Sequence, residues 1–251
     1  MFRFSRCSGL AVIALLIGSA AHADTVVIPS AYASQDAPTE VAYPFAVGQF
    51  SNRPYRYQQV YDATGFGSPG DVIWISDIAF RVDQPNGDLG AFVVQDVDVH
   101  LSTTAKAVNG LSGGSTAALD SNVGNDSTLV FSGTLNWDPC GATACVFDPF
   151  DESIHFTTPF VYDPTAGNLL LEIYNFSTPP FPNNFFDAVQ NDASMSNTRD
   201  MIDVVDGTTH HFFTDAVGLV TQFTFTVPEP GAISSVASAL LALAGLKRRR
   251  A

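Results

Sequence analysis

Basic residues are scarce in this chain of 251 residues, in which eleven lysines and arginines stand against twenty-five aspartates and glutamates. Six of the eleven lie close to the termini, at Arg3, Arg6 and 247–250. Between residues 24 and 230, five cations and all twenty-five acids remain, which leaves a net charge of −20. So acidic a surface repels nucleic acid and anionic lipid, which excludes a nucleic-acid-binding function and favours cations, neutral or cationic glycans, or other proteins as partners.

The residues that usually carry catalysis are also few. Glycoside hydrolysis needs two neighbouring carboxylic acids, yet the glutamates that precede residue 229 are isolated from one another, at Glu40, Glu152 and Glu172. No nucleophile or zinc-protease motif surrounds any histidine after residue 24. Outward strand positions are predicted for His100 and His155, and a turn for His210-His211. We therefore expect a protein that is not an enzyme, with no bound metal at the histidines.

A helical period is missing between residues 24 and 227, where apolar and polar residues instead alternate with the period of two that is typical of half-buried strands. The predicted strands are 72–82, 93–101, 128–137, 154–162, 169–174 and 219–227, with weaker candidates at 55–61 and 203–205. The turn residues at 84–88 predict that the first two of these strands form a hairpin. The region 109–126 is rich in glycine, serine and asparagine and is expected to form one long loop.

The alternation also predicts which side chains face the core. Trp74 is expected inside, while Asp77 and Arg81 are expected on the outer face of the same strand. Other inward predictions are Val72, Ile78, Phe80, Val82, Val93, Val97, Val99, Leu101, Leu129, Phe131, Leu135 and Trp137. Asp98, His100, Glu172 and Tyr174 are predicted to point outward. Seven or eight such strands indicate an all-β fold, an antiparallel β-sandwich of jelly-roll or immunoglobulin-like type, over residues 24–226.

The N-terminal segment has the three parts of a secretory signal. Arg3 and Arg6 precede the apolar run 10–17, and small residues follow at Ala21 and Ala23. This pattern predicts a signal peptide over residues 1–23, which signal peptidase removes by cleavage before Asp24.

The C-terminal segment combines a polar break, an apolar run and a block of positive charge. As a helix, the run 231–246 spans about 24 Å, less than the hydrocarbon core of a bilayer. We therefore expect a transmembrane helix over 231–246 that anchors the protein only until it is processed, with a permanent tail anchor as the alternative. The polar break is Val227, Pro228, Glu229 and Pro230. The charge stop is Lys247, Arg248, Arg249 and Arg250.

This order of Pro-Glu-Pro, apolar run and basic stop over 227–251 resembles the PEP-CTERM sorting signal of bacterial envelope and exopolysaccharide-associated proteins. The resemblance implies that an exosortase recognises the segment and cuts it near Pro-Glu-Pro. It also implies an inner-membrane intermediate in a Gram-negative-type bacterium, followed by release to the cell surface or the extracellular matrix. Segments 57–61, 78–83 and 158–171 look similar to ectodomains of other PEP-CTERM proteins, a resemblance that implies no particular activity.

Cysteine is used sparingly, since only Cys140 and Cys145 lie outside the predicted signal peptide. In an exported domain, two cysteines separated by four residues are expected to form a disulfide. So small a ring contributes about 2 kcal/mol and fixes one loop rather than the core. A zinc site is the alternative, but two thiols without neighbouring third and fourth ligands make it a weak one.

One loop stands out as a candidate ligand site. Residues 178–187 contain three phenylalanines and three prolines, and the rings of Phe181, Phe185 and Phe186 offer flat faces on which a sugar or a protein could stack. The alternative is that these rings complete the core.

The sequence thus predicts an exported, non-catalytic ectodomain that is associated with exopolysaccharide or biofilm matrix. A glycan- or calcium-binding module is the alternative, and a sandwich-fold glycoside hydrolase is the third candidate. Twenty-one of the acids are aspartates, residues that are common in calcium loops, so Ca²⁺ is the one cofactor that the composition leaves open.

Overall fold

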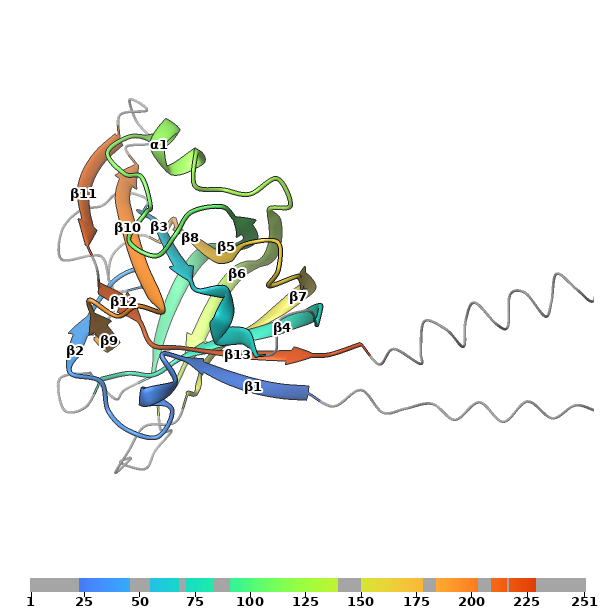
Figure 1. The fold of residues 1–251 in the computed structure, drawn as a ribbon. Coiled ribbons are helices and arrows are strands. Elements are labelled where there is room, and N and C mark those ends of the chain that lie inside the picture. Colours follow the sequence, from blue (N-terminus) through green and yellow to red (C-terminus); the bar gives the residue numbers. More distant parts are fainter. Residues whose placement is uncertain are drawn as a thin grey trace, which may run out of the picture. The chain divides into compact units, whose positions relative to one another are not determined.

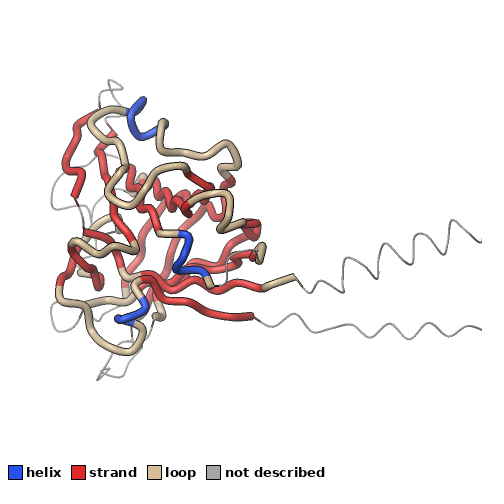
Figure 2. The backbone as a smooth tube through the Cα atoms, viewed as in Figure 1, coloured by secondary structure: helices blue, strands red, loops and turns tan. Residues whose placement is uncertain are grey.

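The computed structural model of the chain describes residues 23–45, 55–67, 71–83, 91–139, 150–177, 184–202, 209–215 and 217–228. All strands in these ranges belong to one unit that spans His22–Val227. Within the described part of the chain strands predominate (Figure 2), and the helical turns are the α-helix α1 (Thr116–Asp120) and the 3-10 helices η1 (Ser30–Tyr32) and η3 (Ala63–Phe66). The all-β prediction is therefore confirmed.

The strands form three sheets in which every pair of neighbours is antiparallel (Figure 1). The four-stranded sheet has the order β1 (Ala23–Ile28), β13 (Thr221–Thr226), β4 (Ile73–Phe80) and β7 (Glu152–Tyr162). The six-stranded sheet has the order β11 (Thr209–Asp215), β10 (Met195–Ile202), β3 (Tyr55–Tyr61), β8 (Asn168–Asn175), β5 (Phe92–Thr104) and β6 (Thr128–Trp137). The small sheet has the order β12 (Val217–Leu219), β9 (Phe186–Gln190) and β2 (Thr39–Val41).

The first and last strands of the unit lie side by side. β1 pairs with β13 along its whole length, so that Ala23 is the partner of Thr226. Figure 1 shows the start of β1 and the end of β13 on the same side of the unit. Its two ends therefore leave from neighbouring points.

All three sheets contribute to one hydrophobic core. Tyr57 and Ile173 come from the six-stranded sheet, Ile78 and Phe223 from the four-stranded sheet and Phe186 from the small one, and all five are fully buried. Phe223 alternates with partly exposed residues along β13, whereas β3 is buried along its whole length, so the outer face of the six-stranded sheet is covered at β3 as well.

The predicted core position of Trp74 is wrong, because β4 contains a β-bulge. Trp74 is 48% exposed and Val72 is 38% exposed, whereas Ile75 is completely buried. The pairing of β4 with β7 shifts between Ile75 and Asp77. The additional residue reverses the alternation, so that the later prediction, burial of Ile78, is confirmed.

The same kind of irregularity accounts for two further errors. Val93 and Leu129 were predicted inside, but each is 45% exposed. The pairing of β5 with β6 shifts between Val94 and Val97, and again between Val99 and His100, where His100 is the partner of Leu129; Val130 is buried in place of Leu129. Beyond these shifts the predicted burial is confirmed at Val97, Val99, Leu101, Leu135 and Trp137, while Phe131 is partly buried.

The predicted hairpin between the first two strands is also wrong. β4 pairs with β13 and β7, whereas β5 pairs with β6 and β8, so the two strands lie in different sheets. The region 109–126 connects β5 to β6 as expected and carries α1.

Several sequence-based predictions lie outside the described residues, namely Ala21 and most of the signal peptide, Cys140 and Cys145, Phe181, the strand at 203–205, and the tail from residue 229, including Glu229, Pro230, Lys247, Arg248, Arg249 and Arg250. Among the residues that are described, none of the helices combines the length and the apolar character that crossing a membrane requires.

Candidate functional site

An open pocket lies on the outer face of the six-stranded sheet, where three adjacent strands each present alternate residues. Arg56 on β3 and Asp98 on β5 both pair with Tyr174 on β8. In the next row, His100 pairs with Glu172. Because neighbouring residues on a strand face opposite ways, these side chains lie opposite the core residues of the same strands.

The pocket has a volume of about 560 Å³. Its lining combines charged groups, polar groups and rings: Arg56, Asp98, His100, Asp120, Val123, Ser127, Glu172, Tyr174 and Phe176. A cavity of this size, with a few fixed polar groups beside aromatic faces, suits a small organic ligand or one or two units of a polymer.

The loop between β5 and β6 forms one wall of the pocket and is held to the sheet by Gln58 and Asn122. The Gln58 side chain donates to the Leu119 carbonyl oxygen at 3.1 Å and to the Glu172 carboxylate at 2.6 Å. Asn122 donates to Gln58 Oε1 at 2.8 Å and to the Ser112 carbonyl oxygen at 2.8 Å. Both side chains are almost fully buried, so the loop covers polar groups that would otherwise face water.

A buried guanidinium organises the floor of the pocket. Arg56 is 3% exposed, and it donates through Nε to Glu172 at 2.8 Å and through Nη1 to Asp120 at 2.7 Å. Burial lowers the pKa of Arg56, but the charge of Glu172 and the hydrogen bond to Asp120 outweigh this effect, and the net shift of the pKa is upward. Arg56 therefore stays charged and fixes both carboxylates in place.

Three rings stand next to this charged group. The Arg56 guanidinium lies over the Tyr174 ring at 5.1 Å from its centroid, and Phe176 stacks parallel to Tyr174 with centroids 5.9 Å apart. His100 meets Tyr174 edge to face at 5.8 Å. Burial raises the pKa of Tyr174 to about 12, with a further upward contribution from the charge of Glu172. Tyr174 is thus a neutral hydrogen-bonding group at physiological pH.

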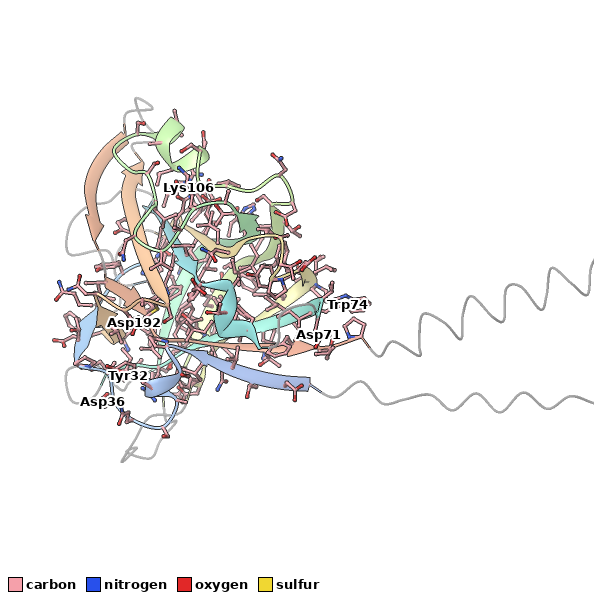
Figure 3. All side chains as sticks on the ribbon, viewed as in Figure 1. Tyr32, Asp36, Asp71, Trp74, Lys106 and Asp192 are labelled. Carbon is pink, nitrogen blue, oxygen red and sulfur yellow. The ribbon has the colours of Figure 1, made fainter. Side chains whose placement is uncertain are left out.

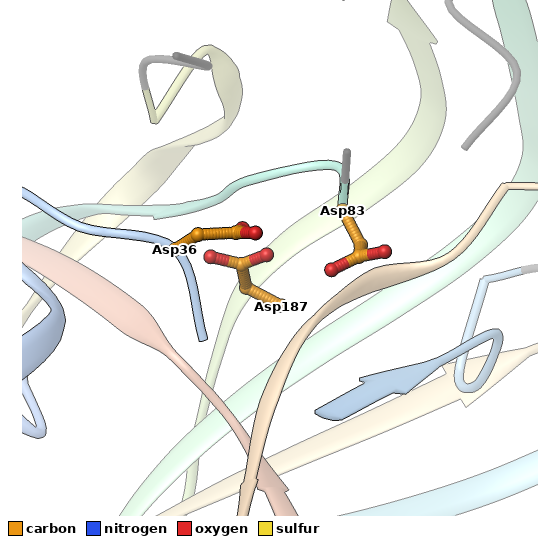
Figure 4. A group of neighbouring side chains, drawn as sticks. All are labelled: Asp36, Asp83 and Asp187. Atoms are coloured by element: carbon orange, nitrogen blue, oxygen red, sulfur yellow. The ribbon is translucent and has the colours of Figure 1, made fainter. Parts of the chain in front are cut away.

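A second group of charged residues lies away from the pocket, around Asp187 on β9. Asp36, Asp83 and Asp187 each offer a carboxylate oxygen within 4.8 Å of the others (Figure 4). The fixed backbone around them includes the Asp83 amide, which donates to the Phe185 carbonyl oxygen at 2.8 Å. These three carboxylates are the described residues that could hold a metal ion.

Arg81 is buried beside this group, which corrects the prediction that it points outward. It is 1% exposed, its Nε donates to Asp187 Oδ2 at 2.6 Å, and its Nη2 donates to the Gln35 carbonyl oxygen at 2.7 Å. Burial raises the pKa of Asp187 to about 7; the charge of Arg81 opposes that shift, and the charges of Asp36 and Asp83 add to it.

The predicted ligand loop 178–187 is not an exposed aromatic surface at its C-terminal end. Phe186 is fully buried, with its ring 5.3 Å from that of Phe45, so its assignment as a ligand residue is wrong. Phe185 is partly buried. Phe186 belongs to the core because it lies on the inward face of β9.

The remaining predicted site residues fall in strands or next to them. Ala23 and Asp24 belong to β1, and Val227 and Pro228 follow β13. His155 is exposed as predicted and contacts Asp77. The predicted turn at His210-His211 is wrong, because both residues lie in β11.

The sequence predicts outward positions for Asp98, His100, Glu172 and Tyr174 but assigns none of them to a ligand site. The available signal is that three separate strands alternate charged or aromatic residues with apolar ones. Their convergence depends on the strand order, which the sequence does not specify.

Comparison with known proteins adds no relative: no family model matches the chain, and neither a curated protein nor a solved structure is significantly similar to it.

Proposed function

We propose that this chain is an exported, non-catalytic protein of the bacterial cell surface or extracellular matrix, and that it binds neutral or cationic glycan chains of the exopolysaccharide or biofilm. The observation that carries the glycan-binding part is the open pocket on the six-stranded sheet, where Tyr174 and Phe176 stand beside fixed carboxylates and a guanidinium. Sugars present apolar C–H faces to aromatic rings and hydroxyl groups to charged side chains, and this pocket offers both kinds of contact.

The charge of the pocket narrows the class of glycan. Its acids, Asp98, Asp120 and Glu172, outnumber its one permanent cation, Arg56, which already pairs with two of them. An acidic polysaccharide would meet repulsion here, whereas a neutral or amino sugar would not.

Export and sorting are proposed from the termini of the sequence. In this account signal peptidase cuts before Asp24, and the tail 227–251 is a PEP-CTERM signal that holds the protein in the inner membrane until an exosortase cuts near Pro228. The pairing of Ala23 with Thr226 supports the proposal, because a domain tethered to one membrane by both ends needs those ends close together. Cleavage before Asp24 would leave the pairs from Asp24 to Ile28 in β1 intact.

At the level of fold we propose a β-sandwich of jelly-roll or immunoglobulin-like type, in which the four-stranded and six-stranded sheets face each other. The shared hydrophobic cluster, with Ile78 and Phe223 from one sheet and Tyr57 and Ile173 from the other, supports this arrangement.

Retention on polysaccharide beads tests glycan binding. We expect the purified protein to be retained by beads that carry a neutral or amino polysaccharide, and Phe176→Ala to weaken that retention at least tenfold, which corresponds to about 1.4 kcal/mol. Trp74→Ala is the matched control, because it removes an exposed ring, 48% accessible, that does not line the pocket. Equal losses of retention in both variants would contradict the proposed pocket. Hydrolysis of a glycan by the protein would contradict the proposal that it is non-catalytic.

Cell fractionation with intact-mass analysis tests the sorting proposal independently. We expect a mature chain that starts at Asp24, lacks the segment after the Pro-Glu-Pro motif, and occurs at the cell surface or in the matrix. A full-length chain in the cytosol would contradict it.

A further inference from the structure

Three aspartates from distant parts of the sequence meet at one end of β9. Asp36 precedes β2, Asp83 follows the bridge that Val82 forms with Phe186, and Asp187 lies within β9. Figure 4 shows the carboxylate of Asp187 between those of Asp36 and Asp83, with oxygens of all three side chains turned toward the shared space.

Asp187 carries a buried oxygen that needs a partner. The residue is 1% exposed, and its Oδ2 accepts hydrogen bonds from Arg81 Nε at 2.6 Å and from the Ala37 amide at 3.3 Å. Its Oδ1 is buried and has no hydrogen-bond partner. A buried carboxylate oxygen that faces two other carboxylates is stabilised when a cation binds there or when the carboxyl group takes up a proton.

The charge of the cluster favours a cation. Asp36, Asp83 and Asp187 gather three carboxyl groups at one point, and the Arg81 guanidinium pairs with Asp187. The guanidinium contacts Asp187 through Oδ2, which leaves the Oδ1 side of that carboxylate available.

The chemistry of the donors points to calcium. The group contains carboxylate oxygens and no imidazole or thiolate, a donor set that suits a hard cation rather than zinc or copper. Oxygens that bind the same Ca²⁺ from opposite sides lie about 5 Å apart, and the three candidate ligand atoms lie within 4.8 Å of one another. Asp36 is exposed, so the ion and its remaining water ligands have a route from solvent.

We propose that Asp36, Asp83 and Asp187 bind one Ca²⁺ ion, which ties the segment before β2 and the segment after β4 to β9. This site lies outside the glycan pocket and shares none of its residues. Its existence does not depend on the proposed function.

Isothermal titration calorimetry of the full-length chain, stripped of metal with a chelator, tests the proposal. We expect CaCl2 to bind at one site with a Kd in the range of about 10⁻⁵ to 10⁻³ M, as for weak calcium sensors and extracellular calcium modules. Calcium should also raise Tm, and excess chelator should reverse the rise. MgCl2 and ZnCl2 serve as comparison ions and are expected to bind at least tenfold more weakly.

Asp36→Asn is the main variant, because an exposed side chain can lose its charge without disturbing the core. It should weaken Ca²⁺ binding at least tenfold and reduce the calcium-dependent rise in Tm. Asp71→Asn is the matched control: it removes the same charge from an exposed residue that lies at the other end of the view from Asp36 (Figure 3), and it should bind as the unchanged protein does.

Three outcomes would overturn the proposal. The first is neither heat nor a change in Tm with CaCl2, the second is equal Ca²⁺ affinity in Asp36→Asn and Asp71→Asn, and the third is tighter binding of Zn²⁺ or Mg²⁺ than of Ca²⁺. None of these readouts uses a glycan, so they are separate from the bead experiment.

Discussion

Replacement of Arg81 by methionine tests whether the buried ion pair with Asp187 holds this end of the fold together. Methionine keeps most of the side chain's length and apolar stem but removes its charge and all its donors. Arg81 and Asp187 are 1% and 0% exposed in their side chains, so water cannot replace the guanidinium as a partner for the carboxylate.

The size of the effect follows from what the variant leaves behind. Removing one member of a buried ion pair typically costs about 3–5 kcal/mol, because the remaining charge is uncompensated. Here the carboxylate of Asp187 already has a pKa raised to about 7, chiefly by burial, and without Arg81 it can take up a proton instead of staying charged. Because protonation relieves the uncompensated charge, we expect the free energy of unfolding to fall by about 3 kcal/mol at neutral pH, the lower end of that range. The carbonyl oxygens of Tyr32 and Gln35 lose their guanidinium donor as well.

Urea unfolding in calcium-free buffer, followed by tryptophan fluorescence, measures this loss as a lower midpoint at unchanged slope. Lys106→Met is the control, since Lys106 is partly exposed and its ammonium donates to Ser112 Oγ at 3.0 Å. The control should change stability by less than about 0.5 kcal/mol. If Arg81→Met cost no more than the control, the reasoning about an uncompensated buried carboxylate would be refuted.

Three further predictions concern packing and titration. Trp137→Ala should cost about 3–5 kcal/mol in urea unfolding, because Trp137 is 5% exposed in the core, whereas Trp74→Ala should cost less than about 1 kcal/mol. Gly124→Ala should destabilise the protein by about 1–3 kcal/mol in the same assay, since the added Cβ would lie 1.9 Å from a backbone carbonyl oxygen. Tyr174 should ionise only near pH 12, as measured by the phenolate absorbance that Tyr174→Phe removes, and because its folded pKa is raised, the stability it contributes below about pH 10 should be lost as the pH rises toward 12.

Each of these has an outcome that would contradict it. Equal destabilisation by Trp137→Ala and Trp74→Ala would mean that the bulge in β4 is misplaced. An unchanged midpoint for Gly124→Ala would mean that the loop over the pocket does not approach the β5 backbone so closely. Ionisation of Tyr174 near pH 10 would show that its hydroxyl group is fully hydrated.

The alternation of apolar residues predicted the strands well but lost their phase at bulges. Along β4 the inward prediction fails at Trp74 and holds at Ile78, and the register shift lies between them. The alternation of inward and outward residues continues on each side of a bulge, but its phase changes there. A prediction made from a short stretch of strand is therefore correct, whereas one carried across the bulge is not. Such a shift has no marker in the local sequence of β4, since Ser76 and Asp77 are ordinary outward residues.

Which strands pair with one another could not be predicted from the sequence. A turn-rich segment at 84–88 suggests a hairpin, yet β4 and β5 enter different sheets. Closing the unit by pairing β1 with β13 joins residues about two hundred positions apart, from Ala23 to Thr226. The free energy that selects such pairs comes from burying both sheets on one core, which a local pattern does not contain.

The burial of charged residues also could not be predicted from the sequence pattern. Arg81 and Glu172 stand at positions that alternation assigns to solvent, and each is nevertheless covered by chain that comes from elsewhere: the segment before β2 over Arg81, and the loop after β5 over Glu172. In both cases an opposite charge offsets the cost of burial, since Asp187 pairs with Arg81 and Arg56 pairs with Glu172. Both candidate sites therefore lie where charged side chains are buried on a covered face of a sheet. The oppositely charged partners that stabilise these side chains lie more than one hundred positions away in the sequence.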